Sequence, residues 1–336
     1  MARGRHGAEH HATVAAPKPP RLLSSPQARN PLTEPPSRID LHGLATDAGA
    51  SERGAGMGPE ALRIAGLAEV LTALGHKVED KGDFRVPPSP RTAERRRAEI
   101  LAVAAEASAR GYETLKSAGL PVFLGGDHSI SMGSVSGVAR WCAAQDRELF
   151  VLWLDAHGDF NTPAISPSGN LHGMALALLC GEDEFDDAFG GAWRAEIDPA
   201  NVTLFGTRST DAAERALLAE RGIEVIDMRM IDEQGATMPI RRLIERVTRT
   251  SGHLHLSLDI DAMDPGIGPG VGTTVPGGLT YREAHLVMEM LHDAGIVGSL
   301  DIVELNPFLD HAGMSAKLLV DLAASLFGRK IMGRPR

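Results

Sequence analysis

The chain is poor in cysteine and in aromatic residues. Its 336 residues include two cysteines and two tyrosines, and aromatic side chains make up only 4% of the sequence. Two cysteines outside any Cys-x-x-Cys pattern cannot form a disulfide framework, so we expect a reducing, cytoplasmic location. The sequence has no run of 18 apolar residues and no apolar secretion segment near its amino terminus. We therefore expect neither a membrane-spanning helix nor a secretion signal.

Basic residues are also fewer than acidic residues. The sequence has 34 Lys and Arg against 44 Asp and Glu, which gives a net charge of −10. A nucleic-acid partner would require a basic surface for its phosphates, so this balance argues against one. Hydrophobic residues make up 43% and charged residues 23%, as in an ordinary globular protein. A chain of this length can bury a large core without disulfides.

Residues 1–37 differ in composition from the rest of the chain. They contain seven of the 21 prolines, five Lys or Arg and two acids. Such a segment cannot bury enough apolar surface to offset the entropy lost on ordering. We predict a disordered, proline-rich tail over residues 1–37, followed by a single folded domain over residues 38–330. An organelle transit peptide is the alternative, but the prolines would break the amphipathic helix that it requires.

Short apolar stretches alternate with helix-like stretches from residue 38 onward. The apolar stretches have the length of strands and lack internal polar alternation, which is typical of parallel strands buried on both faces. Their alternation with helices predicts an α/β fold with a mainly parallel sheet covered on both faces. The predicted strands are residues 38–41, 121–124, 149–154, 201–206, 224–227, 254–260 and 299–305. The predicted helices are residues 59–74, 91–117, 211–220, 240–249, 280–294 and 314–327.

Clusters of acids and histidines follow three of these strands. Ligands of parallel sheets bind beyond the carboxyl ends of the strands, so these clusters are candidates for a site. In an extended chain the side chains at i, i+2 and i+4 lie on one side, and we expect the polar groups of each cluster to converge. The clustered side chains are His128, Asp155, His157, Asp159, Asp259 and Asp261.

The four aspartates of these clusters require a positive counterpart. Carboxylates packed together repel one another, and each resists ionisation. Two divalent cations would balance the four negative charges, and the two histidines would fill remaining coordination positions. Oxygen-rich ligands with a minority of imidazole favour Mn²⁺ over metals that prefer thiolate. Any one cluster alone is more often a turn or a cap, but three at strand ends in one chain favour a binuclear metal site.

Three motifs, taken together, resemble those of the ureohydrolase family, which includes arginases and agmatinases. They are GGDHS at 125–129, DAHGD at 155–159 and SLDIDAMDP at 257–265, and the resemblance extends over residues 39–327. It implies a single catalytic domain with a three-layer α/β/α sandwich and two Mn²⁺ ions per chain. By this resemblance, one ion is bound by His128, Asp155, Asp159 and Asp259, and the other by Asp155, His157, Asp259 and Asp261.

The loops after the second motif are similar to those of arginases in particular. Asn161 and Ser168 match the residues that bind the α-carboxylate of the amino acid substrate. Asp211 and Glu214 match the acids that meet its α-amino group. Ser209 departs from the pattern, because arginases often carry Asp at this position. Both Asn161 and Ser168 also stand in sequences that favour turns on their own.

The resemblance implies a hydrolase of arginine metabolism, as in the urea cycle, that converts L-arginine to L-ornithine and urea. A hydroxide bridging the two Mn²⁺ ions would attack the guanidinium carbon. Asp159 would hydrogen-bond this hydroxide, His172 would exchange protons with solvent, and Glu283 would orient the guanidinium. Glu283 also lies three residues after Thr280, the spacing of a capping box at a helix start. The family further implies a homo-oligomer, a trimer or a hexamer.

Three other functions remain open. An amidinohydrolase for agmatine or 4-guanidinobutyrate would not need Asn161 and Ser168 together, because these substrates lack the α-amino acid group. A two-metal phosphoesterase would use similar ligands but would need Arg or Lys to clamp phosphate, and the motif loops contain almost none. An inactive binding paralogue is disfavoured because all six metal ligands and His172 are present.

Overall fold

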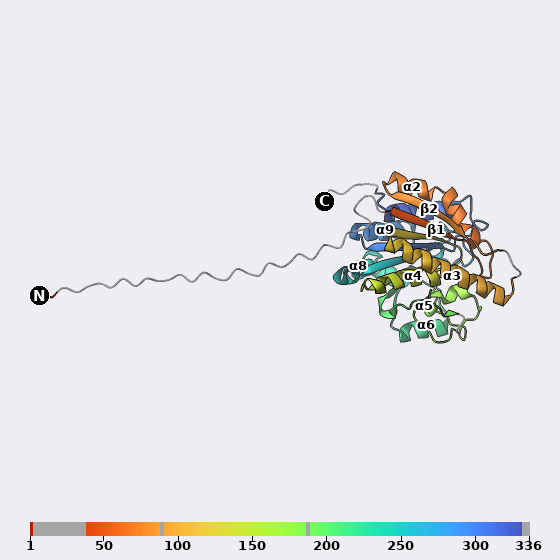
Figure 1. Cartoon of the computed structure of the whole chain (residues 1–336), viewed down its shortest axis with the longest axis horizontal. Helices are drawn as coiled ribbons and strands as arrows, with labels where there is room; N and C mark the ends of the chain where they lie inside the picture. The colour runs from red at the N-terminus through yellow and green to blue at the C-terminus, as the bar shows by residue number, and fades with distance from the viewer. Residues whose placement is uncertain (3–37, 88–90, 186–188, 331–336) are drawn as a thin grey trace.

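A single parallel sheet forms the centre of the protein. We describe a computed structural model, which covers residues 1–2, 38–87, 91–185 and 189–330, so the predicted tail lies almost wholly outside the described residues. Every pairing in the sheet is parallel, and the strand order is β2-β1-β3-β8-β7-β4-β5-β6. Strands β1 and β2 lie side by side in Figure 1. The strands are β1 Arg38–Leu44, β2 Lys77–Phe84, β3 Gly119–Gly125, β4 Leu149–Leu154, β5 Val202–Thr207, β6 Glu224–Asp227, β7 His253–Asp259 and β8 Val297–Val303.

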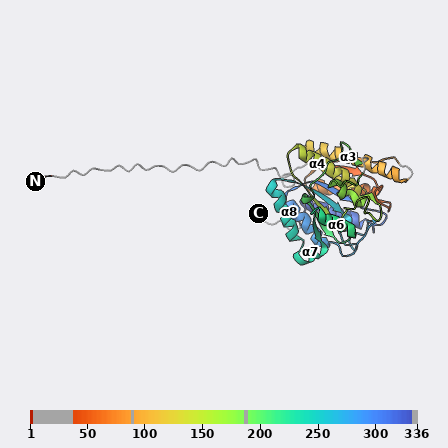
Figure 2. The same cartoon turned by 90° about the horizontal axis from the view of Figure 1, so that it is seen from below.

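Helices cover both faces of this sheet. The core on one face includes side chains from α1, α2 and α7 to α10, and the cores on the other include side chains from α3 to α6. Figure 2 shows α3 and α4 on one side of the sheet and α7 and α8 on the other. The predicted three-layer α/β/α fold is thereby confirmed. The helices are α1 Gly58–Ile64, α2 Leu67–Ala73, α3 Ala93–Lys116, α4 Ser131–Ala144, α5 Ala175–Leu179, α6 Ala212–Glu220, α7 Met228–Gln234, α8 Thr237–Thr250, α9 Tyr281–Ala294 and α10 Met314–Leu326.

The central strand β4 shows why its sequence is apolar throughout. Leu152 and Leu154 pack into the core on one face, whereas Val151 and Trp153 pack into the core on the other. Successive side chains of a strand point to opposite faces, so a strand covered on both sides must be apolar at every position. All six residues of β4 are buried.

The structure corrects several predicted elements. Strand β2 was not predicted because its sequence, KVEDKGDF, is mostly charged, as suits the exposed edge of a sheet. The predicted helix at 59–74 is two helices, because Gly66 between them has a φ of +90°. Helices α4, α5 and α7 were also missed. Among the described residues, no helix is long and apolar enough to cross a membrane.

Candidate metal centre

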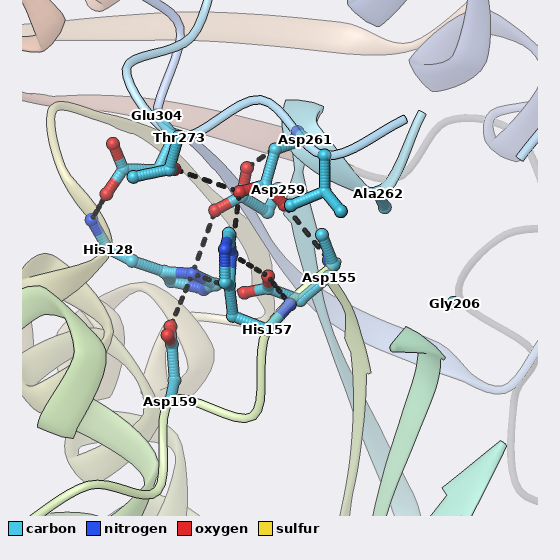
Figure 3. A network of polar contacts seen from close by, with 12 residues as sticks. His128, Asp155, His157, Asp159, Gly206, Asp259, Asp261, Ala262, Thr273 and Glu304 are labelled. Carbon is cyan, nitrogen blue, oxygen red and sulfur yellow. Dashed lines mark hydrogen bonds and ion pairs between the residues drawn. The ribbon is translucent and has the colours of Figure 1, made fainter. Parts of the chain in front are cut away.

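His128 stands at the centre of a buried group of carboxylates. It follows β3, and its Nδ1 lies 3.0 Å from Asp155 Oδ2, 3.0 Å from Asp159 Oδ2 and 3.1 Å from Asp259 Oδ2. All four residues are buried. Figure 3 shows the three carboxylates, which come from the ends of β4 and β7 or the loops after them, turned toward the imidazole. The loops predicted to converge therefore do so.

His157 forms a second, adjoining group. Its Nδ1 lies 3.0 Å from Asp261 Oδ2 and 3.4 Å from Asp155 Oδ1. The ligand atoms of His128, Asp155 and Asp259 lie close enough to hold one ion, and those of Asp155, His157 and Asp261 could hold another. Asp155 is shared by the two groups, as expected of a bridging ligand. Asp259 belongs to the first group, and its expected bridging of both ions stays a prediction.

The backbone brings these side chains together by turns, so the expectation of a continued extended chain is wrong in detail. Strand β4 ends at Leu154, and the loop that follows carries Asp159 with a φ of +49°. Asp155 Oδ1 accepts a hydrogen bond from the backbone N–H of His157 at 2.7 Å. Asp259 Oδ1 likewise accepts from the N–H of Asp261 at 2.8 Å. Each aspartate thus fixes the turn that presents the next ligand.

The atoms of the first group suit a cation. His128 Nε2 lies 2.8 Å from Ser257 Oγ, and a hydrogen bond donated there leaves the lone pair of Nδ1 toward the carboxylates. The ring also stacks on Trp153, with centroids 4.1 Å apart. His128 Nδ1 and Asp159 Oδ2 are buried without a hydrogen-bond partner among the described residues. Buried polar atoms of this kind are rare unless something else satisfies them, so the donor set fits a divalent cation.

Electrostatics favour the same interpretation. Burial, together with the charges of Asp261 and Asp155, raises the pKa of Asp259 well above its usual range. Burial and the charge of Asp155 raise the pKa of Asp159 to about 6. The predicted mutual repulsion of the carboxylates is therefore present in the folded protein. A positive charge among them would allow all four to ionise.

A cavity of about 280 Å³ opens over these ligands. All four residues predicted to read the α-substituents line it, as does Ser209. Glu214 is buried, and its Oε1 accepts a hydrogen bond from the backbone N–H of Phe160 at 2.9 Å. Burial raises the pKa of Glu214 to about 7. The predicted substrate residues in the cavity wall are Asn161, Ser168, Asp211 and Glu214.

Glu283 is not brought into this cavity. Its Oε2 accepts hydrogen bonds from the backbone N–H of Thr280 at 2.9 Å and from the Thr280 hydroxyl at 2.8 Å. Thr280 Oγ1 in turn accepts from the N–H of Glu283, which completes a capping box at the start of α9. Glu283 is absent from the described residues that line the cavity. Its capping role, predicted from its spacing, is confirmed, and the structure does not support its predicted contact with the guanidinium.

Glu304, just after β8, lines the cavity and was not predicted. Its Oε1 accepts a hydrogen bond from the N–H of His128 at 2.7 Å and lies 2.8 Å from His172 Nδ1. Burial alone would lower the pKa of His172, but the charge of Glu304 and the hydrogen bond to it raise that pKa to about 9. The rule that acids at strand ends are candidates covers Glu304. It was missed because, unlike the predicted ligands, it does not stand in a cluster of acids and histidines in the sequence.

Known proteins are similar to this chain in fold and in sequence. The profile of the arginase family matches residues 37–328. An arginase from Agrobacterium fabrum is 50% identical over 297 residues, covering 87% of this chain and 91% of that protein. The solved arginase structures from Bacillus caldovelox and Bacillus subtilis align with TM-scores of 0.81 and 0.79 at 39% and 40% identity, each covering 88% of this chain and 100% of its own. This chain belongs to the arginase family.

Proposed function

We propose that this chain hydrolyses the guanidinium group of L-arginine to give L-ornithine and urea, with two Mn²⁺ ions as cofactor. One observation carries the proposal: two imidazoles and four carboxylates lie together, five of them line the floor of one cavity, and the cavity wall presents amide, hydroxyl and carboxylate groups. The imidazoles and carboxylates of the floor suit two cations, and the polar groups of the wall suit the charged α-substituents of an amino acid. The arginase name of its relatives supports the same substrate.

The six predicted ligands would hold the two ions. When bound, such cations lower the pKa of water from about 16 to about 7 and so provide a nucleophile at neutral pH. Carboxylate oxygens with a minority of imidazole nitrogens favour Mn²⁺ over thiolate-preferring metals. The six ligands are His128, Asp155, His157, Asp159, Asp259 and Asp261.

The cavity wall would read the amino acid end of the substrate. Asn161 and Ser168 would donate hydrogen bonds to the α-carboxylate, and Asp211 and Glu214 would meet the α-amino group. Asn161 Nδ2 already donates to Asp211 Oδ2 at 3.3 Å, so the two sets of groups adjoin. Among the described residues that line the cavity there is no Lys or Arg, which disfavours a phosphoester and suits a cationic substrate.

The reacting end of the substrate would lie near His172 and Glu304. Glu304 presents a buried carboxylate to the cavity and takes the guanidinium-orienting role that the sequence had suggested for Glu283. Against the effect of burial, the charge of Glu304 and the hydrogen bond to it raise the pKa of His172 to about 9, which favours its protonated form at neutral pH. His172 would donate that proton to the departing amine, and Asp159 would accept the proton of the attacking water.

We further propose that the protein acts in the cytoplasm as a homo-oligomer. Large apolar side chains on its surface support an interface: Phe308 is 74% exposed and Tyr281 is 48% exposed. A second copy packed against these side chains would remove their apolar surface from water. Light scattering of the full chain would measure the assembly, and a monomer would contradict this part of the proposal.

A urea-release assay tests the substrate. The Mn²⁺-loaded protein is offered L-arginine, agmatine and 4-guanidinobutyrate at matched concentrations. Polar groups built to bond α-substituents are left unpaired by substrates that lack them, which gives discrimination of about 10⁴. We expect kcat/KM for L-arginine to exceed both others by orders of magnitude. Equal hydrolysis of agmatine would contradict the arginine assignment and leave the metal site intact.

A further inference from the structure

Arg208 directly follows β5 and donates only to backbone carbonyls. Its guanidinium makes six hydrogen-bond contacts with five carbonyl oxygens that belong to three separate segments of the chain. The acceptors are Gly206 at 3.1 Å, Asp261 at 2.7 Å, Ala262 at 3.3 Å, Met263 at 3.2 Å and Val275 at 2.7 and 3.1 Å. The planar fork of a guanidinium suits this task, because its donors point in several fixed directions at once.

These contacts surround one metal ligand, Asp261. Asp261 Oδ2 accepts from Thr273 Oγ1 at 3.1 Å, and Thr273 lies on the loop that Arg208 holds through Val275 (Figure 3). Asp261 Oδ1 accepts from the N–H of Ala156 at 3.0 Å. The carbonyl of Ala156 accepts in turn from the backbone N–H of Arg208 at 2.9 Å. The Arg208 guanidinium therefore holds the backbone of Asp261 and the loop that orients its Oδ2, while the backbone of Arg208 fixes the segment that orients its Oδ1.

The positive charge of Arg208 is not paired with a carboxylate of the described residues. Among the described residues, no carboxylate lies within 4.0 Å of its guanidinium, although the charges of Asp261, Asp155 and Asp259 in the metal centre act on it. A cation that bonds carbonyls offsets part of the repulsion between the aspartates without occupying their oxygens. Those oxygens remain available to metal ions. The next residues, 209–211, line the substrate cavity, so the same side chain also anchors the start of that wall.

We propose that Arg208 is a positioning residue that holds Asp261 in place and so sets the affinity of the Asp155–His157–Asp261 group for its cation. The inference rests on the two-cation site of the proposed function. A residue that orients a ligand typically contributes about 10- to 100-fold to metal affinity. Nothing in this role requires Arg208 to touch the substrate.

Arg147 provides a matched control. It is also half-buried, and it donates to the carbonyls of Ser251 at 2.8 Å and Gly252 at 2.7 Å. These carbonyls precede β7, at the end of the sheet opposite to the metal ligands. Arg147→Met therefore removes an arginine with similar bonding to backbone carbonyls without approaching the metal centre. Both Met variants should lower the melting temperature.

The experiment titrates metal-free, full-length protein with Mn²⁺ in a calorimeter. We expect two binding steps in the wild type. Arg208→Met should weaken one step about 10- to 100-fold and change the other less than about threefold, and Arg208→Lys should lie between. Arg147→Met should retain both steps. His157→Ala already impairs binding of the same ion. Adding Arg208→Lys to His157→Ala should therefore leave the affinity of the remaining binding step unchanged.

Several results would overturn the inference. Arg208→Met that binds both ions as the wild type does, or that weakens both steps equally, would show that Arg208 does not serve Asp261 specifically. If Arg208→Met does not fold, wild-type binding by Arg208→Lys would overturn the inference equally. The titration uses no arginine. A wild type that binds two ions but releases no urea would therefore refute the proposed substrate and leave this inference standing.

Discussion

Two side chains that line the cavity sit on strained backbone. Asp159 and Glu304 have φ values of +49° and +65°, in the left-handed region that residues with a Cβ rarely occupy. Both carboxylates line the cavity. Each conformation costs on the order of 1–3 kcal/mol and persists only where the surroundings impose it. The chain accepts this strain at the two positions where a carboxylate must turn back toward the metal centre.

Asp259 tests the binuclear site at the level of one residue. Its Oδ2 lies 3.1 Å from His128 Nδ1 within the first group of ligands. Asp259→Ala should lose at least one Mn²⁺ per chain and lower turnover by at least about 100-fold. Elemental analysis measures the metal content. Asp227→Ala removes an aspartate that ends β6 and caps α7, and it should keep full metal content. Two ions per chain in Asp259→Ala would contradict the assignment.

Variants of Asp211 and His172 distinguish a role in substrate recognition from a role in proton transfer. Asp211→Ala should lower kcat/KM for L-arginine and leave agmatine nearly unchanged, because agmatine lacks the α-amino acid group that Asp211 would read. His172→Asn should slow both substrates by about 10²–10⁴-fold and retain their ratio, since His172 handles protons. Steady-state assays with both substrates measure the two ratios. A variant of His172 that changes the preference would assign it to substrate recognition instead.

Strands and helices could be predicted where burial produces a clear pattern of apolar residues in the sequence. The strands β3 and β4 are apolar because both faces are covered, whereas β7 alternates leucines with the buried polar residues His253, His255 and Ser257. The polar residues that end these three strands revealed the metal ligands. Helix α4 was missed because Gly133 and Gly137 suggest a loop. A Cβ at these positions would approach Ala104 O within 2.2 Å and Ser108 O within 2.4 Å. The glycines therefore serve close packing against α3, which no pattern within α4 itself reveals.

Helix α9 explains why one site residue was misplaced. The sequence around Glu283 serves the helix start, since the carboxylate closes on Thr280, and only the tertiary structure shows which acid faces the cavity. Glu304 lies just after β8, which ends at Val303, but no histidine or second acid follows it closely in the sequence to mark a cluster. A single acid at a strand end is therefore recognised as a site residue only in the folded structure.

Substituting each of these two glutamates in turn tests which of them contacts the guanidinium. Glu283→Ala should lower the free energy of unfolding by at most about 1 kcal/mol, through loss of half of the capping box, and leave KM for L-arginine unchanged. Glu304→Gln should lower kcat/KM by at least about 100-fold, because the neutral amide no longer pairs with His172 or a guanidinium. Urea denaturation and the urea-release assay supply the two measurements. A raised KM in Glu283→Ala would restore its predicted substrate role.

At the scale of the whole molecule, the tail is a separate question. The family profile begins at residue 37, close to the predicted start of the folded domain at residue 38. If residues 1–37 are a disordered appendage, their deletion should leave the melting temperature within about 1 °C and turnover unchanged. Calorimetry and the urea-release assay on the truncated chain measure both. A large drop in either would mean that the tail packs on the domain or completes an oligomer.

His42 links the stability of the whole fold to pH. It lies in β1, is 3% exposed, and its Nε2 lies 2.9 Å from Thr114 Oγ1 of α3. Burial, followed by the charge of Arg110, lowers its pKa to about 4, while the unfolded value is about 6.5. Asp40 on β1 and Lys81 and Asp80 on β2 supply the other nearby charges, which partly cancel.

The direction of the pH effect follows from this shift. Between pH 6.5 and 4 the unfolded chain protonates at His42 and the native chain does not, so the free energy of unfolding falls as pH falls. A shift of this size corresponds to about 3 kcal/mol across that window. His42→Gln removes the titrating group, so its free energy of unfolding should fall less between about pH 7 and about pH 4.5 than that of the wild type. Urea denaturation at both pH values measures the difference, and His311→Gln on the surface controls for the loss of a histidine. Equal losses in His42→Gln and wild type would mean that His42 is protonated in the native state.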